Sequence, residues 1–325
     1  AIQDTTAPVI DTAASDLTVE CDGSGNTADL NAWLASNGGA ASSDDCSAIA
    51  WSNDFSALSD LCGETGAATV TFTASDSCGN SSTTTATFTI EDTTDPTIDT
   101  AASNIVVECD GSGNNGEIQN WLDTNGGAIA SDSCSSVTWS NDYGGTASDC
   151  SLPIQVTFTA TDACGNSVST TATYAIQDTT APVIDTAASD LTVECDGSGN
   201  TADLNAWLAS NGGATSSDDC SAIAWSIDFS ALSDLCGETG AATVTFTATD
   251  ACGNSSTTTA TFTIEDTTDP TIDTTASDLT VECDGSGNTA DLNAWLASNG
   301  GAASSDTCST VTWSNDFSAP VSYTH

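Results

Sequence analysis

The sequence repeats itself, and this constrains the fold more than any other feature. Asp-Thr-Thr-Ala/Asp-Pro recurs at Asp4, Asp92, Asp178 and Asp266, and Glu-Cys-Asp-Gly-Ser-Gly-Asn recurs at Glu20, Glu108, Glu194 and Glu282. We divide the chain into repeat 1 (4–91), repeat 2 (92–177), repeat 3 (178–265) and a partial repeat 4 (266–325), with 1–3 as the end of a preceding repeat. Both ends of the sequence cut through a repeat, so we expect it to be a window on a longer tandem array.

Most hydrophobic patterns within a repeat have the period of β-strands. Alternation predicts strands over 16–21 and 48–52, and the runs 69–74 and 83–90 flank a polar turn, which is typical of a hairpin. The segment 26–38 differs, because its apolar residues have helical spacing and it ends at Asn-Gly. We therefore expect a mostly β protein of tandem immunoglobulin-like β-sandwich repeats, each with one short helical insertion and disulfides.

The charge of the chain excludes several classes of function. It has 46 Asp and Glu, no Lys or Arg, and one His at position 325. Nucleic acid is excluded as a direct partner, because phosphates are neutralised by Lys or Arg. Catalysis that needs Lys, Arg or an internal His is excluded as well. No stretch approaches the roughly 18 apolar residues of a membrane span, so we expect no membrane insertion in this stretch.

The hairpin and the segment after it resemble a known family. The residues are Val70-Thr71-Phe72-Thr73-Ala74-Ser75-Asp76-Ser77-Cys78-Gly79-Asn80, followed by Thr87-Phe88-Thr89-Ile90-Glu91-Asp92-Thr93-Thr94-Asp95-Pro96. They are similar to the end of hyalin-type (HYR-like) repeats, which are immunoglobulin-like and fill long bacterial surface proteins, including the gliding-motility adhesins of flavobacteria. The resemblance covers every complete repeat, but not the helical insertion. It implies an extracellular spacer or adhesive stalk on a bacterial cell surface, and it carries no catalytic residue over.

The cysteines indicate an oxidising compartment. Each complete repeat has four, an even number in a small domain, whereas a zinc site would need closely spaced pairs or histidines. We predict that all fourteen form disulfides: Cys21, Cys46, Cys62, Cys78, Cys109, Cys134, Cys150, Cys164, Cys195, Cys220, Cys236, Cys252, Cys283 and Cys308. Three pairings are open in each repeat. We favour Cys21–Cys46, which would clamp the helical insertion. The remaining pair, Cys62–Cys78, is geometrically less favourable. An extended segment 68–75 spans roughly 25 Å, so the chain at Cys62 would have to fold back to reach Cys78.

Oxygen-bearing side chains recur where each predicted helix begins. Asp22, Ser24 and Asn26 occupy positions 1, 3 and 5 of a loop, and Asp29 lies in the first helical turn. This spacing is typical of a calcium loop that enters a helix, although positions 6 and 12 are not the Gly and Glu of an EF-hand. The alternative is a capping box formed by Asn26 and Asp29. The equivalent residues are Asp110, Ser112, Asn114 and Glu117; Asp196, Ser198, Asn200 and Asp203; and Asp284, Ser286, Asn288 and Asp291.

A second acidic cluster falls at the boundaries between repeats. It consists of Glu91, Asp92 and Asp95 at the first boundary and of Glu265, Asp266 and Asp269 at the third. Carboxylates without a Lys or Arg partner suit Ca²⁺ that stiffens a joint, and the alternative is a solvated linker held extended by proline. Ca²⁺ is the only cofactor that we expect. Asp76, Asp162 and Asp250, in the hairpin turns, are expected to form Asx turns.

Tryptophan and threonine recur at fixed places. We expect the two Trp of each repeat, such as Trp33 and Trp51, to lie in the core; the alternative is an exposed platform for sugars. Eight Thr in Asp-Thr-Thr and Asp-Thr-Ala sequences resemble the O-glycosylation acceptors of Bacteroidetes, and the alternative is ordinary turn chemistry. They are Thr5, Thr12, Thr93, Thr100, Thr179, Thr186, Thr267 and Thr274.

These features together predict a structural extracellular stalk or filament of a bacterial cell-surface adhesin. Its partners would be the neighbouring repeats of the same chain and other copies in a filament. Directly joined repeats should follow one another along one axis, at about 30–40 Å per repeat for strands of 8–10 residues. One alternative is a carbohydrate- or ice-binding module that uses the threonine run 82–89. The other is an enzyme, which we do not expect, because acidic pairs such as Asp44 and Asp45 recur and no repeat differs from the rest in a pocket.

Overall fold

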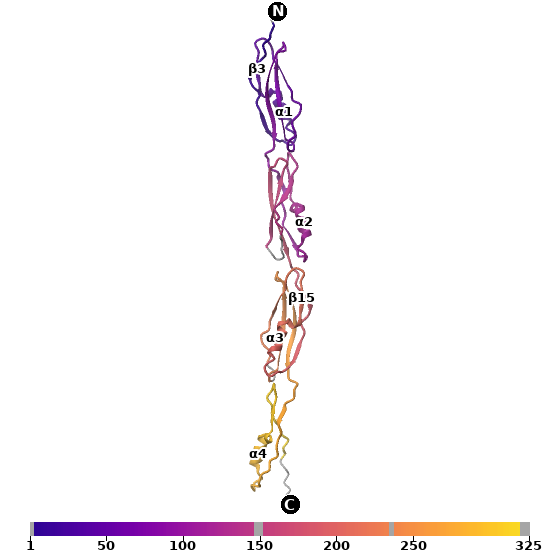
Figure 1. The fold of residues 1–325 in the computed structure, drawn as a ribbon, viewed down its shortest axis with the longest axis vertical. Helices are drawn as coiled ribbons and strands as arrows, with labels where there is room; N and C mark the ends of the chain where they lie inside the picture. Colours follow the sequence, from indigo (N-terminus) through magenta and orange to yellow (C-terminus); the bar gives the residue numbers. More distant parts are fainter. Residues whose placement is uncertain (1–2, 146–151, 234–236, 319–325) are drawn as a thin grey trace. The chain divides into compact units, whose positions relative to one another are not determined.

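The computed structural model describes residues 3–145, 152–233 and 237–318. It forms two compact units, Ala1–Gln177 with repeats 1 and 2, and Asp178–His325 with repeats 3 and 4. Figure 1 shows the same set of strands and one helix recurring in each complete repeat. The architecture is mostly β and sandwich-like, as the sequence predicts.

Repeat 1 shows the plan that the other complete repeats follow. Its elements are β1(Val9–Thr12), β2(Leu17–Glu20), α1(Thr27–Ala35), the 3₁₀ turn η1(Asn37–Gly39), β3(Ala41–Ser43), β4(Ala50–Asn53), β5(Gly66–Ser75) and β6(Ser81–Glu91). A four-stranded sheet has the order β2-β6-β5-β4, and β1 pairs with β3 in a separate two-stranded sheet. All pairs are antiparallel except β2 with β6, which run parallel.

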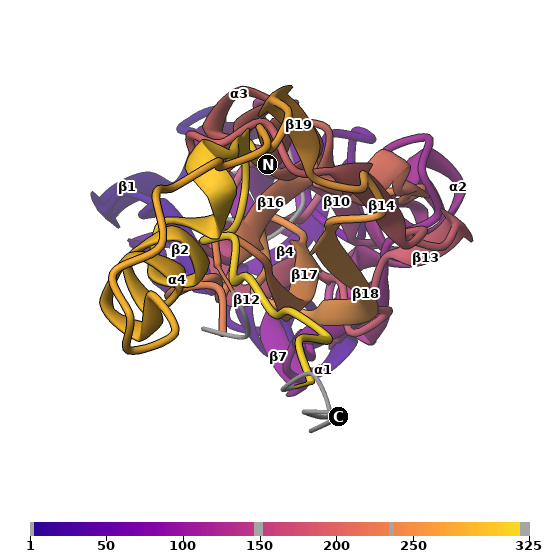
Figure 2. The same cartoon turned by 90° about the horizontal axis from the view of Figure 1, so that it is seen from below.

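Repeats 2 and 3 repeat this order. In repeat 2 the elements are β7(Thr97–Thr100), β8(Ile105–Glu108), α2(Asn115–Asp123), η2(Asn125–Gly127), β9(Ile129–Ser131), β10(Thr138–Asn141), β11(Ile154–Thr161) and β12(Ser167–Gln177). In repeat 3 they are β13(Val183–Thr186), β14(Leu191–Glu194), α3(Thr201–Ala209), η3(Asn211–Gly213), β15(Thr215–Ser217), β16(Ala224–Ile227), β17(Gly240–Thr249) and β18(Ser255–Glu265). Figure 2 shows β16, β17 and β18 side by side, in agreement with their register.

The partial repeat 4 contains β19(Thr271–Thr274), α4(Thr289–Ala297), η4(Asn299–Gly301) and β20(Ala303–Ser305). In the described part of this repeat, only the β19–β20 pair is formed, without a four-stranded sheet. The sequence of repeat 4 ends before the residues that form β5 and β6 in repeat 1. Its helix therefore buries no residue, in contrast to α1, α2 and α3.

The core of a complete repeat lies between the helix and the inner face of the four-stranded sheet. In β5 the alternating Val70 and Phe72 are fully buried, and Phe88 on β6 joins them. Leu30 and Trp33 of α1 pack on these residues, and the rings of Trp33 and Phe72 meet edge to face at 5.2 Å. This explains why a single helix interrupts a β sequence, since its apolar face closes the core.

The tryptophan prediction is confirmed for the helices of the three complete repeats, whereas Trp295 of α4 is only half-buried and the strand Trp lie partly outside the core. The helix residues Trp33, Trp121 and Trp207 are buried, and each donates its indole N–H to a backbone carbonyl at 3.0–3.1 Å. Trp51 on β4 is half-buried and packs against the edge of the core. Its equivalent in repeat 4, Trp313, is 39% exposed, because the strands that would cover it are absent from the described part of that repeat.

Candidate functional site

Because β2 pairs in parallel with β6, the cysteines of a repeat lie at two opposite ends of the sheet. Leu17 lies opposite Phe88 and Glu20 opposite Glu91, so Cys21 follows at the end of β6 and donates its N–H to the Glu91 carbonyl at 2.8 Å. Cys78 lies in the turn before β6 begins. The eleven residues of β6 span about 36 Å at 3.3 Å per residue.

The other two cysteines are sorted in the same way. Cys62 precedes β5, whose first residue lies opposite Ile90, so it belongs to the same end as Cys21. Cys46 lies at the end with the hairpin turn, because its neighbour Ser47 accepts a hydrogen bond from Ser77 N–H. A disulfide requires Cα atoms within about 7 Å. The predicted pairs Cys21–Cys46 and Cys62–Cys78 are therefore wrong, since the members of each pair lie at opposite ends.

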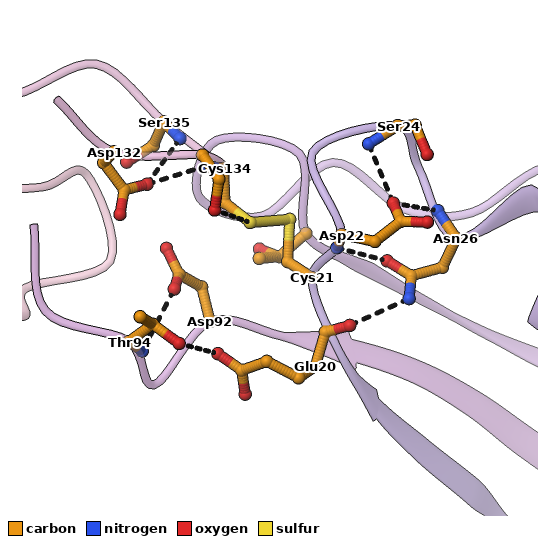
Figure 3. Close-up of a disulfide and its surroundings, with 12 residues drawn as sticks. Glu20, Cys21, Asp22, Ser24, Asn26, Asp92, Thr94, Asp132, Cys134 and Ser135 are labelled. Carbon is orange, nitrogen blue, oxygen red and sulfur yellow. Dashed lines mark hydrogen bonds between the residues drawn. A yellow bond between two sulfur atoms is a disulfide. The ribbon is translucent and has the colours of Figure 1, made fainter.

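The disulfides instead join repeat 1 to repeat 2 and repeat 3 to repeat 4. Cys21 of repeat 1 bonds to Cys134 of repeat 2 with a Cα–Cα distance of 6.0 Å, and Cys62 bonds to Cys164 at 5.2 Å. In the second unit, Cys195 of repeat 3 bonds to Cys308 of repeat 4 at 6.1 Å. Figure 3 shows the first of these bonds between the loop after β2 and the loop after β9. The first and third cysteines of repeat 1 thus meet the second and fourth of repeat 2, and the first cysteine of repeat 3 meets the second of repeat 4.

The prediction that all fourteen cysteines are oxidised is also wrong. Cys46, Cys78 and Cys283 are free and exposed. Cys109, Cys220 and Cys252 are disulfide-bonded, while Cys150 and Cys236 lie outside the described residues. The negative charge of Asp4, then burial, Asp44 and Asp45 raise the pKa of the Cys46 thiol, because they disfavour a thiolate.

Beside the disulfide, backbone hydrogen bonds link consecutive repeats, and a glycine allows their backbones to approach closely. The N–H of Glu64 donates to the carbonyl of Cys134 at 2.8 Å, and Glu238 N–H donates to Cys308 at 3.0 Å. Gly63 has a φ of 57°, and a Cβ at this position would collide with the carbonyl of Cys134. Sequence reasoning did not single out this glycine, although Cys-Gly-Glu recurs beside the third cysteine of repeats 1 and 3.

A glutamate before the first cysteine fixes the start of the next repeat. Glu20 accepts hydrogen bonds from the N–H and the hydroxyl of Thr93 at 2.8 and 2.9 Å and from the Thr94 hydroxyl at 2.8 Å. These bonds, with that from Thr93 N–H the strongest cause, lower the pKa of Glu20. Glu194 makes the same contacts with Thr267 and Thr268. Sequence reasoning missed this role, and the recurrence of Glu before each of these cysteines was the available signal.

Acidic side chains that lie far apart in the sequence converge around the first aspartate of each complete repeat. In repeat 1, carboxylate oxygens of Asp4, Asp44 and Asp76 lie within 4.8 Å of one another. In repeat 2, oxygens of Asp92 and Asp132 and the sulfur of Cys134 lie within the same distance of one another, and the charge of Asp162 acts on Asp92. Asp178 and Asp250 meet in repeat 3. Figure 3 shows the carboxylates of Asp92 and Asp132 facing each other.

Amide side chains bring these aspartates together. Asn80 donates from Nδ2 to the Asp4 carbonyl at 3.2 Å and to Oδ2 of Asp76 at 2.7 Å. Asn166 joins Asp92 to Asp162 in the same way, at 3.1 and 2.8 Å. The Asx-turn prediction for the hairpin is confirmed, because Asp76 accepts from Cys78 N–H and Asn80 N–H at 2.8 Å. Asp162 and Asp250 accept the same two bonds in their repeats.

The junction prediction thus named one residue of this cluster, Asp92, and missed Asp132. Glu91 is exposed at the end of β6, and Asp95 accepts a hydrogen bond from Ser167 N–H at 3.1 Å. At the third boundary, Glu265 is exposed and Asp266 accepts from Thr268 N–H at 3.2 Å, while Asp269 is exposed. The pairing of distant turns, rather than neighbourhood in the sequence, decides which acids meet.

The loop before each helix is closed by its own hydrogen bonds. Asp22 accepts from Ser24 N–H at 2.8 Å and Asn26 N–H at 3.0 Å, and these bonds lower its pKa, that from Asn26 most strongly. The side chain of Asn26 accepts from Asp22 N–H and donates to the Glu20 carbonyl. The capping-box alternative is wrong, because Asn26 has a left-handed backbone and its side chain makes no cap hydrogen bond; it donates instead to Oδ2 of Asp29 at 3.2 Å. Calcium in this loop stays a prediction.

The remaining sites stay predictions. All eight threonines proposed for glycosylation are exposed, and those at 93 and 267 donate their hydroxyls to glutamate. The described residues contain no helix long and apolar enough to cross a membrane.

The comparisons give no family for this chain. No protein-family model matches it, and no curated protein matches it. Solved structures of cadherin repeats are similar at low identity. The Drosophila N-cadherin EC1-4 structure is 11% identical, with a TM-score of 0.27 over 70% of this chain and 68% of that one. Mouse cadherin-23 EC22-24 is 12% identical, with a TM-score of 0.29 over 80% of this chain and 99% of that one. The likeness concerns the repeated β architecture alone.

We expect the Glu20 and Glu194 contacts to make stability depend on pH. A lowered folded pKa stabilises the fold above the unfolded value near 4.5, and this contribution is lost as the pH falls through the folded pKa. The variant Glu20→Gln/Glu194→Gln should unfold at a lower temperature than the wild type at pH 7, and the difference should shrink below about pH 4.5. Thermal scans from pH 7 to pH 3 measure this.

The matched control for this prediction is Glu91→Gln/Glu265→Gln, which removes the same charge from exposed positions. A difference between wild type and the Glu20 variant that is as large at pH 3 as at pH 7 would contradict the prediction.

Proposed function

We propose that the chain is a structural stalk of an extracellular surface protein in which disulfides clamp each repeat to the next. The observation that carries this proposal is the pairing of Cys21 with Cys134, Cys62 with Cys164 and Cys195 with Cys308, always between consecutive repeats. A disulfide within a repeat would stabilise that repeat alone. A disulfide between repeats transmits force past the peptide linker.

The position of the bonds supports a role under tension. Force that enters through β1 and β2 reaches Cys21 and passes directly to Cys134, 113 residues further along the sequence. The intervening residues, which include the hairpin of repeat 1, are bypassed and cannot be extended while the bond is intact. Released residues would otherwise add roughly 3.5 Å each. The bond therefore keeps the stalk short even if a repeat unfolds.

Disulfides are typical of oxidising compartments, which supports an extracellular location. The bacterial cell surface, the relation to hyalin-type repeats and a part in gliding motility remain proposals, supported by the sequence resemblance of the hairpin region. Calcium belongs to the proposal too, supported by acidic clusters in a chain without Lys or Arg. The partners would be neighbouring repeats and other copies of the chain. We assign the stalk no catalytic role.

Single-molecule stretching tests the stalk. The oxidised chain should show short extensions on unfolding, and reductant should lengthen them by about 3.5 Å for each residue released from the loops. The variant Cys21→Ser/Cys134→Ser should show the longer extension without reductant. Cys46→Ser/Cys78→Ser is the matched control, because both thiols are already free, and it should behave as the wild type. Equal extensions with and without reductant would exclude a clamping role.

A second candidate function, binding to ice, is favoured by the outer face of the sheet. Threonines pair across β5 and β6 at Thr69–Thr87, Thr71–Thr85 and Thr73–Thr83, and none of the six is buried. Repeat 3 has the same three pairs on β17 and β18. Paired residues lie about 5 Å apart across the strands, and successive pairs about 7 Å apart along them, which makes a regular array of hydroxyls and methyls. The burial of the helix Trp speaks against a platform for sugars.

Ice recrystallisation tests this second candidate. Thr71→Tyr/Thr245→Tyr places a bulky ring in the middle of the face in both repeats and should abolish any inhibition of ice growth by the wild type. Val9→Tyr/Val183→Tyr is the control, because both valines are 60% exposed on the small sheets, and it should retain the inhibition. A wild type without inhibition, or equal loss in both variants, would refute ice binding.

A further inference from the structure

The carboxylate of Asp92 is buried and half unsatisfied. Its side chain is 8% exposed, and one oxygen accepts a hydrogen bond from Thr94 N–H at 3.2 Å. Its other oxygen is buried without a hydrogen-bond partner among the described residues. Figure 3 shows this oxygen directed toward Asp132 and Cys134. A buried carboxylate oxygen is costly to desolvate unless a donor or a cation compensates it.

The carboxylates around Asp92 add negative charge. Asp132 uses one oxygen to accept from Cys134 N–H and Ser135 N–H at 2.8 and 2.9 Å, and no bond to its second oxygen is seen within the described ranges. Burial, followed by the charges of Asp132, Asp162 and Glu20, raises the pKa of Asp92, against the effect of its Thr94 bond. The sequence contains no Lys or Arg, so no such side chain of this chain can neutralise the pair.

The same arrangement recurs, which makes it a property of the repeat. In repeat 1, Asp4, Asp44 and Asp76 bring three carboxylates within 4.8 Å of one another, and one oxygen of Asp4 is buried without a hydrogen-bond partner in the described residues. Asp178 and Asp250 lie within the same distance in repeat 3. Each cluster contains the first residue of its repeat. The other aspartates come from the hairpin turn, as Asp76 and Asp250 do, or from the loop after β3 or β9, as Asp44 and Asp132 do.

We propose that each of these clusters binds one Ca²⁺ ion, with Asp92 and Asp132 as ligands in repeat 2 and Asp4, Asp44 and Asp76 in repeat 1. Ca²⁺ takes six to eight oxygen ligands in flexible geometry, which suits carboxylates from separate turns completed by water. Zn²⁺ would favour thiolate or imidazole, and the nearby Cys134 sulfur is already in a disulfide. The proposal deepens the calcium dependence in the proposed function, but it does not require a stalk.

The ion would sit beside the disulfide that joins two repeats. Asp132 and Cys134 belong to the same loop, and Asp132 orders that loop through the N–H groups of Cys134 and Ser135. Ca²⁺ bound between Asp92 and Asp132 would therefore hold the loop that contains Cys134 against the first residues of repeat 2. The junction would then be stiffened by a cation as well as by a covalent bond.

Two sets of matched variants of the full chain test the site. Asp4→Asn/Asp92→Asn/Asp178→Asn/Asp266→Asn removes the first aspartate of every repeat. The control, called the helix-loop variant, is Asp29→Asn/Glu117→Gln/Asp203→Asn/Asp291→Asn, which removes the same number of charges from the first turns of the helices, next to the loops that enter them. Thermal unfolding is recorded in CaCl₂, MgCl₂ and NaCl at matched ionic strength, and calorimetric titration with Ca²⁺ gives the number of ions bound.

The wild type should be stabilised more by Ca²⁺ than by the other salts, and the helix-loop variant should keep this difference. The first-aspartate variant should lose it and bind at least three fewer ions. Without Ca²⁺ it should be at least as stable as the wild type, because it removes buried uncompensated charge. A Ca²⁺ effect lost only in the helix-loop variant, or equal effects of all salts on the wild type, would overturn the site. Disulfide clamping is measured separately by stretching, so either proposal can fail alone.

Discussion

The parallel pairing of β2 with β6 is the constraint on which the rest of each repeat depends. It places the end of β2 beside the end of the last strand, so Cys21 and Glu20 emerge where the next repeat begins. The same pairing leaves Cys46 and Cys78 at the other end, one strand length away. A repeat built in this way cannot close the pairs Cys21–Cys46 and Cys62–Cys78. Cys21 and Cys62 lie at the end of the repeat that meets the following repeat, and Cys46 and Cys78 lie at the opposite end.

The junction concentrates several interactions in a few residues. Disulfides supply covalent strength, Glu20 binds the threonines that open the next repeat, and a glycine allows the two backbones to approach. Small domains have modest cores, since a repeat of under 90 residues buries a limited share of its surface. Cross-linking neighbours therefore stabilises the array where each repeat alone is weakest, at its ends. The cation sites would act at the same place.

The absence of Lys and Arg gives the acidic residues an unusual role. In most proteins a buried aspartate pairs with a basic side chain or accepts several N–H groups. Asp162 follows the second route, and hydrogen bonds from Asn166, Gly165 and Cys164 lower its pKa in spite of burial. Asp92 has one such bond, and burial raises its pKa. Asp92, where we propose that a cation binds, thus differs from Asp162, whose hydrogen bonds stabilise its charge.

The sequence by itself determined the repeats, the strands around the hairpin, the helical insertion and the helix Trp in the core, because these depend on local periodicity. It also showed that any counter-ion for the acids must come from outside the chain, since Lys and Arg are missing. Only the tertiary structure decided which cysteines pair and which aspartates meet. Spacing along the chain favoured Cys21–Cys46, but a parallel strand pair between 17–20 and 88–91 leaves no local signal. Long-range pairing therefore placed the partner of Cys21 in the next repeat, 113 residues away.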